Sequence, residues 1–307
     1  MNILSMFLVV SGLCLFEIIS SIDNAIINAE VLSTMSARAR RWFLIYGLLI
    51  AVFLIRALLP WFIVWVATPG LGPLEALTAT FSDDPEVKGA VEKSAPVLLM
   101  GGGVFLVFLF VHWLFLEEKN YGLWGEPFFY SQGVWFYAVA SIILVIVVWA
   151  AMAKNNMIAF GAVVGSTVFF ITQGFKINAE RAERSLLAGP SNMSDISKIL
   201  YLEVIDATFS IDGVLGAFAF TLSIPLILIG NGLGAVVVRE LTMRNIDRIK
   251  KYRYLKNGAM YSILFLGLIM VAESLGHEIP SWASPILTFA VVGYFFLKSK
   301  RAMIKSF

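Results

Sequence analysis

The stretch Phe16-Glu17-Ile18-Ile19-Ser20-Ser21-Ile22-Asp23-Asn24-Ala25 is matched later in the chain by Ile205-Asp206-Ala207-Thr208-Phe209-Ser210-Ile211-Asp212-Gly213-Val214. The two stretches align without gaps at an offset of 189 residues, so that acid meets acid twice and Ser-Ile-Asp is identical in both. Both stretches lie inside long apolar runs, where an acidic side chain is costly. The match therefore indicates an internal repeat that is built around buried carboxyl groups.

The composition of the whole chain indicates a polytopic, all-α membrane protein. Of its 307 residues, 59% are hydrophobic and 14% are charged, against about 25% charged in an ordinary soluble domain. The mean hydropathy is +0.84. These values exclude a disordered protein and nearly every soluble enzyme. The net charge of +2 gives no support to nucleic-acid binding, and with Cys14 as the single cysteine no intramolecular disulfide can form.

Apolar runs predict about nine transmembrane helices, since each helical span needs about 20 apolar residues. The expected spans are 3–31, 42–66, 95–116, 131–153, 157–175, 199–222, 224–238, 258–275 and 283–297. The sixth and seventh are separated near Ser223-Ile224-Pro225, because proline disrupts a helix interior. We expect one transmembrane domain over 1–307, with a first repeat over about 1–175, a cytoplasmic linker over 176–196 and a second repeat over about 197–307.

The distribution of Lys and Arg predicts the orientation, because these residues concentrate in cytoplasmic loops. Taken alternately along the chain, one set of connections carries 19 basic residues and the other set carries 3. This places the N-terminus outside and the C-terminus in the cytoplasm. The first and sixth spans then cross in opposite senses, as the two halves of an inverted-topology repeat do.

Five acids lie inside the expected spans: Glu17, Asp23, Glu203, Asp206 and Asp212. Each would cost about 2.5–3.5 kcal/mol at the bilayer centre if it faced lipid, and the sum would rival the stability of a whole protein. Arg56 is the only basic residue that we expect within a span, with a place in the polar core or along the helix surface as alternatives. The acids must therefore be protonated, paired, hydrated or bound to a cation.

A carboxylate-rich site near the midplane of an inverted repeat predicts a binding site for a cation. Carboxylate and amide oxygens suit hard or borderline divalent cations such as Ca²⁺, Mg²⁺ and Mn²⁺, and metal binding displaces protons from carboxyl groups. Residues six apart on an ideal helix point about 120° away from each other. Either the first helix is unwound near Glu17 and Asp23, or the two acids serve neighbouring positions.

At these motifs the chain resembles the TerC/Alx family of bacterial integral membrane proteins, within the LysE-type transporter superfamily. The shared pattern is an acid followed by Ser-x-Asp-Asn, here Glu17 and then Ser21-Ile22-Asp23-Asn24. A second acidic motif lies in the later half, and the long connection over 67–94 and the position of Glu203 indicate a divergent branch.

The resemblance implies a carrier, not an enzyme, without a resident cofactor, that exports a divalent metal across the bacterial inner membrane. Mn²⁺ is favoured over Ca²⁺, protons are the expected exchange partner, and an association with tellurite resistance is implied. The implied metal ligands are Glu17, Asp23, Asp206 and Asp212, with Asn24 beside them and Glu203 as a further ligand or proton acceptor.

Two other functions stay open. A non-transporting scaffold for metal or tellurite stress would use the basic cytoplasmic segments but would leave the buried acids unexplained. An intramembrane aspartyl hydrolase would use Asp23 and Asp212 as a dyad that shares a proton. Elsewhere, Gly101-Gly102-Gly103 predicts close helix packing, because no Lys-Ser/Thr follows it as in a phosphate loop.

Overall fold

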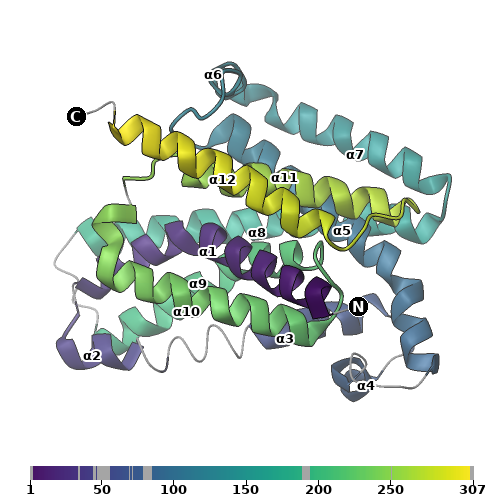
Figure 1. Ribbon diagram of the computed structural model, residues 1–307, viewed down its shortest axis with the longest axis horizontal. Coiled ribbons are helices and arrows are strands. Elements are labelled where there is room, and N and C mark those ends of the chain that lie inside the picture. Colours follow the sequence, from purple (N-terminus) through teal and green to yellow (C-terminus); the bar gives the residue numbers. More distant parts are fainter. Residues whose placement is uncertain are drawn as a thin grey trace.

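The computed structural model describes residues 3–33, 35–43, 46, 56–68, 70, 72–78, 85–188, 194–249 and 251–304. Over these residues the regular structure is helical throughout. The helices are α1 (Ile3–Ser33), α2 (Ala37–Trp42), α3 (Arg56–Ala67), α4 (Pro73–Thr78), α5 (Pro85–Leu116), α6 (Glu126–Ser131), η3 (Gly133–Trp135), α7 (Phe136–Met152), α8 (Asn156–Ala188), α9 (Asp195–Ala217), α10 (Ile224–Ile249), α11 (Leu255–Ser274) and α12 (Ala283–Ile304). The long helices lie side by side in one bundle (Figure 1).

Five helical segments of the described chain are long and apolar enough to cross a membrane: Ile3–Ser21, Glu92–Leu116, Gly133–Met152, Asn156–Asn178 and Leu255–Ser274. They coincide with the first, third, fourth, fifth and eighth expected spans. The seventh expected span coincides with a shorter apolar helix, Ile224–Val238. Most of the second expected span lies outside the described residues. The prediction of an all-helical, multi-pass membrane protein is confirmed, and the count of nine spans stays a prediction.

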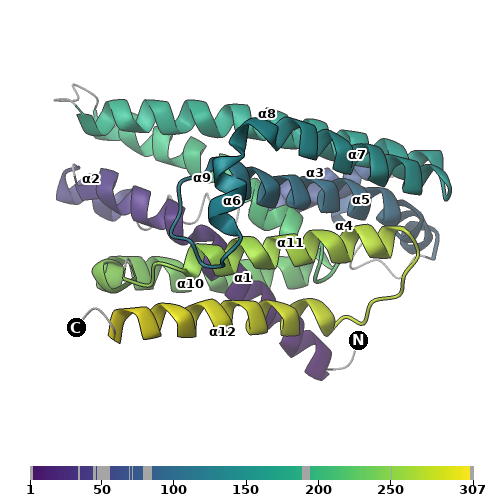
Figure 2. The ribbon, with the colours of Figure 1, turned by 90° about the horizontal axis from the view of Figure 1, so that it is seen from above.

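Helix α5 forms the centre of the bundle. It packs against α8 on one side and against α11 on the other, and α12 packs against α11, as the layers in Figure 2 show. Met100, Phe105 and Trp113 of α5 are completely buried. Helix α7 covers α8 and exposes large apolar side chains such as Val145 and Trp149. A helix that is apolar and exposed in this way suits a lipid environment.

Glycines bring the central helices together. A Cβ on Gly101 would lie 3.0 Å from the carbonyl oxygen of Gly161, and one on Gly103 would lie 2.9 Å from that of Gly267. In lipid the association of helices depends on close packing, which small residues permit, because lipid tails are as apolar as leucine. The prediction that the glycine triplet of α5 serves close helix packing is thereby confirmed.

Some helix ends differ from the expected boundaries. Helix α8 continues to Ala188, so residues 176–188, which we expected in a linker, are helical. Helix α5 already begins at Pro85, although the apolar run begins near residue 95. Both differences have the same reason, since hydropathy falls where charged residues begin while a helical backbone can continue through them. The predicted break after the sixth span is present, between the end of α9 and the start of α10.

The two ends of the bundle differ in charge. Helix α2, which is rich in arginine, lies at the same end as the C-terminus (Figure 1). The N-terminus, α4 and the turn between α7 and α8 lie at the opposite end (Figure 1). These groups of segments belong to the basic and the weakly basic set of connections respectively. These segments of the two sets therefore lie at opposite ends of the bundle (Figure 1).

Candidate cation site

Glu17 is a buried acid at the place where α1 meets α9 and α10. Its residue surface is 1% exposed. A Cβ on Gly213 of α9 would lie 3.3 Å from Glu17 Oε2, and one on Gly234 of α10 would lie 2.6 Å from Glu17 Cβ. Ser21 donates a hydrogen bond from its hydroxyl to Glu17 Oε1. Glu17, the first acid of the first motif, thus lies directly against the second motif.

The contact between α1 and α10 rests on small residues with matching spacing. Gly230 and Gly234 are four residues apart on α10, and they face Leu13 and Glu17, which are four residues apart on α1. Side chains at this spacing share one helix face. Because glycine has no side chain, the stem of Glu17 can lie against the α10 backbone, and its carboxyl group reaches α9.

The backbone of α1 is helical without interruption from Ile3 to Ser33, and that of α9 from Asp195 to Ala217. The unwound first helix, one of the two alternatives from the sequence, is therefore not seen. The side chains of Asp23, Asn24 and Asp206 lie outside the part of the chain that the structure describes.

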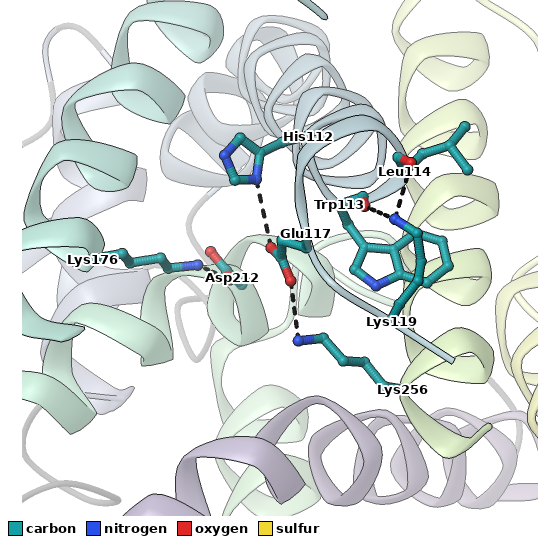
Figure 3. Close-up of polar contacts among 8 residues, drawn as sticks. All are labelled: His112, Trp113, Leu114, Glu117, Lys119, Lys176, Asp212 and Lys256. Carbon is teal, nitrogen blue, oxygen red and sulfur yellow. Dashed lines mark hydrogen bonds and ion pairs between the residues drawn. The ribbon is translucent and has the colours of Figure 1, made fainter. Parts of the chain in front are cut away.

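Asp212 of the second motif pairs with Lys176 of α8. Lys176 Nζ contacts Asp212 Oδ2, with the two side chains 8% and 14% exposed (Figure 3). Asp212 Oδ1 is buried and has no hydrogen-bond partner among the described residues. The sequence analysis placed Lys176 just beyond the fifth span, which it ended at Phe175, and did not assign it to the site. Polar residues recur at helical spacing after Phe175, and this pattern could have indicated that the helix continues through Lys176.

The remaining predicted site residue with a described side chain is Glu203, which is half-buried on α9. Within the described residues, no group of three or more His, Cys, Asp or Glu side chains lies close enough to hold a metal ion. The predicted ligand set includes three residues without described side chains, so the set as a whole stays a prediction.

Asn231 is a second residue that the sequence analysis missed. It lies between Gly230 and Gly234 on the buried face of α10 and is 1% exposed. Neither atom of its side-chain amide has a hydrogen-bond partner among the described residues. Buried amides normally have partners, and an amide oxygen is a common ligand of hard cations. The signal was an asparagine in an otherwise apolar run.

A cluster of ionisable side chains, Glu117, His112 and Lys256, lies at the C-terminal end of α5 (Figure 3). Glu117 Oε2 is 3.0 Å from Lys256 Nζ, and Glu117 Oε1 is 3.5 Å from His112 Nδ1. Burial acts to raise the pKa of Glu117, but the contacts with His112 and Lys256 outweigh it and lower the pKa to about 2. Glu117 is therefore an anion near neutral pH.

Lys119 ends α5 by binding its last carbonyl groups. Its Nζ donates to the carbonyl oxygens of Trp113 and Leu114, the latter at 2.9 Å, and lies 4.5 Å from the centre of the Trp113 ring (Figure 3). Burial lowers the pKa of Lys119 to about 8, although the charges of Glu117 and Glu126 oppose this shift. A cation in this position stabilises the negative end of the helix dipole.

Glu126 shows that a buried acid can serve structure alone. It is 1% exposed and accepts hydrogen bonds from the backbone of Gly122 at 2.6 Å and of Leu123 at 3.0 Å. Asn257 of α11 donates to the same carboxyl group at 3.0 Å. These donors fasten the segment after α5 to α11. Glu126 thus has several donors, whereas Asp212 Oδ1 has none within the part of the chain that the structure describes.

The helical bundle, its membrane-length apolar segments and its charged interior define a multi-pass integral membrane protein. The chain belongs to the family described as "Protein of unknown function (DUF475)", whose model matches residues 22–305.

Among curated proteins, the chain is similar to the uncharacterized membrane protein YceF of Bacillus subtilis (strain 168). The two are 30% identical over 82 residues, which are 27% of this chain and 32% of that protein. The chain thus matches about a third of the length of this relative. No solved structure matches the chain.

Proposed function

We propose that the protein is a secondary transporter that exports a divalent metal cation from the bacterial cytoplasm across the inner membrane. The observation that carries the proposal is the burial of Glu17 where α1 meets α9 and α10, against Gly213 of the second acidic motif. An acid in this position requires a positive partner or a proton. A transported cation that exchanges with protons meets this requirement in both states of a carrier.

The proposed ligands are those that the resemblance to the TerC/Alx family implies. They are Glu17, Asp23, Asn24, Glu203, Asp206 and Asp212. We add Asn231, because its buried amide lies within one turn of Gly234, which contacts Glu17. The oxygen-rich set suits hard or borderline divalent cations. Mn²⁺ is favoured, with Ca²⁺ as the alternative, because the resemblance to the TerC/Alx family implies it.

The proposed topology has nine spans in an inverted repeat, with the N-terminus outside and the C-terminus in the cytoplasm. Two observations support it. The helices that carry the two motifs contact each other through Glu17 and Gly213, as they would beside a pseudo-two-fold axis at the midplane. The arginine-rich α2 and the C-terminus also share one end of the bundle (Figure 1).

The test is Mn²⁺ flux into proteoliposomes that contain a dye quenched by the metal. The variants are Glu17→Gln, Asp23→Asn and Asp212→Asn, and Glu92→Gln serves as a matched control because Glu92 is exposed on α5. We expect flux with the wild type and the control, and at least a tenfold loss in the three site variants, because each removes a charge from the ligand set.

Size-exclusion chromatography in detergent checks that each variant is folded. Unchanged flux in the three folded site variants would refute the acidic site. A folded wild type without flux of Mn²⁺ or Ca²⁺ would favour a membrane scaffold instead. Cleavage of a reporter helix that depends on Asp23 and Asp212 would favour the hydrolase.

A further inference from the structure

The pair between Lys176 and Asp212 is a feature that the proposed transport site does not yet explain. Both side chains are largely buried, and they come from different helices, α8 and α9. Only Oδ2 of the carboxylate is used by the lysine, while Oδ1 lacks a hydrogen-bond partner among the described residues. Asp212 is also next to Gly213, the residue of α9 that contacts Glu17.

In a buried ion pair of this kind, one charged partner can be replaced by another group of the same charge, but it cannot simply be removed. Removal of one partner leaves an uncompensated charge in a medium of low dielectric constant, which is strongly unfavourable. A cation that binds Asp212 removes that penalty, because it supplies the compensating charge when Lys176 leaves. The ammonium group and a metal ion are therefore competitors for the same carboxylate.

A displaced ammonium group stays tethered to α8 by the side chain of Lys176. The lysine stem is long, flexible and strongly charged at its tip. Lys176 can thus withdraw its ammonium group from Asp212 while its backbone stays in place on α8.

We propose that Lys176 is a tethered counter-ion that competes with the transported cation for Asp212. In the cation-free protein the ammonium group neutralises Asp212 and keeps the bundle closed around it. An arriving divalent cation displaces Lys176, and the return of Lys176 to Asp212 promotes release of the cation. This inference rests on the proposed transport function and assigns to Lys176 a role in tuning affinity and turnover.

The test compares Lys176→Gln, Lys176→Arg and Lys256→Gln in the Mn²⁺ flux assay. In Lys176→Gln the cation no longer displaces a competitor, so we expect the half-saturating Mn²⁺ concentration to fall by about tenfold, within the range of coupled binding equilibria. The maximal rate should fall as well, because release loses its driving force. Lys176→Arg keeps the charge and should retain the wild-type half-saturation within about threefold.

The matched control is Lys256→Gln, which breaks an ion pair of Glu117 outside the acidic motifs and should leave the half-saturating concentration unchanged. An unchanged half-saturating concentration in folded Lys176→Gln would reduce Lys176 to a structural residue and overturn the inference. Absence of flux in the wild type would instead refute the proposed function, so the two failures are distinguishable.

A second measurement needs no substitution, in case Lys176→Gln fails to fold. The wild-type protein is treated with an amine-reactive reagent with and without Mn²⁺, and the modification of each lysine is followed by mass spectrometry. We expect Mn²⁺ to increase the modification rate of Lys176 several-fold and to leave that of Lys256 unchanged. An unchanged or lower rate at Lys176, in protein that transports Mn²⁺, would contradict the displacement.

Discussion

Replacement of Gly234 by alanine should damage the proposed site and the stability of the bundle together. An added Cβ would lie 2.6 Å from Glu17 Cβ, 2.7 Å from Glu17 Cγ and 2.8 Å from the carbonyl oxygen of Cys14. These atoms belong to the α1 backbone or to the first part of a side chain, so they cannot turn aside as the tip of a flexible side chain can. Helix α10 must move away from α1.

The expected cost follows from two opposing effects. Overpacking of a well-packed interior costs about 1–3 kcal/mol, and here the fixed atoms favour the upper part of that range. Alanine regains up to about 1 kcal/mol of helix propensity relative to glycine. The net loss is about 2 kcal/mol, which corresponds to a decrease in Tm of about 4 °C or more. Because Glu17 moves, Mn²⁺ flux should fall as well.

The assay is thermal unfolding in detergent, together with Mn²⁺ flux. Gly293→Ala is the control, because Gly293 lies within α12 and an added Cβ there meets no atom within 4 Å. Its Tm should stay the same or rise. Equal Tm values for the two variants, with wild-type flux in Gly234→Ala, would refute the close packing of α10 against Glu17.

The central packing and the charged end of α5 give two further predictions. Gly165→Ala should lower Tm by several degrees, because its Cβ would overlap the backbone of Gly101. Gly174→Ala on the same helix is the control and should leave Tm unchanged, because its Cβ meets nothing within 4 Å. The same Tm in both variants would contradict the packing of α8 on α5. Glu117→Gln should cost roughly 1–2 kcal/mol at pH 7, through lost charged contacts that are partly screened by solvent. Since the folded pKa of about 2 lies below the ordinary 4.5, this stabilisation is complete above pH 4.5 and is lost as the pH falls towards 2. Tm measured from pH 7 to pH 3 should therefore fall less in Glu117→Gln than in the wild type, and a parallel fall would exclude the ion pair as the cause.

The position of each described apolar helix could be read from the sequence, since hydropathy and the effect of proline act on neighbouring residues. The break before Pro225 and the packing role of Gly101 to Gly103 are examples, and both agree with the structure. The length of α8 could not be read in this way. The apolar run that marks the fifth span ends at Phe175, but the helix itself continues through charged residues to Ala188.

The partners of the buried acids depend on tertiary structure. The sequence shows that Glu17 and Asp212 lie in apolar runs and therefore need compensation, but it gives no indication that Lys176 faces Asp212. That pairing depends on the rotation of α8 and α9 about their axes and on the distance between them. Neither quantity is encoded in the spacing of residues along one helix.

The sequence by itself determined that the protein lies in a lipid bilayer, where its helical segments lie and that it has two acidic motifs. It could do so because the free energy of transfer into lipid is a property of each residue. Only the tertiary structure decided that Glu17 lies between Gly213 and Gly234 and that Lys176 neutralises Asp212. The physical reason is the close approach of helices at glycines. It is a cooperative result of many contacts, and it selects which buried charges meet.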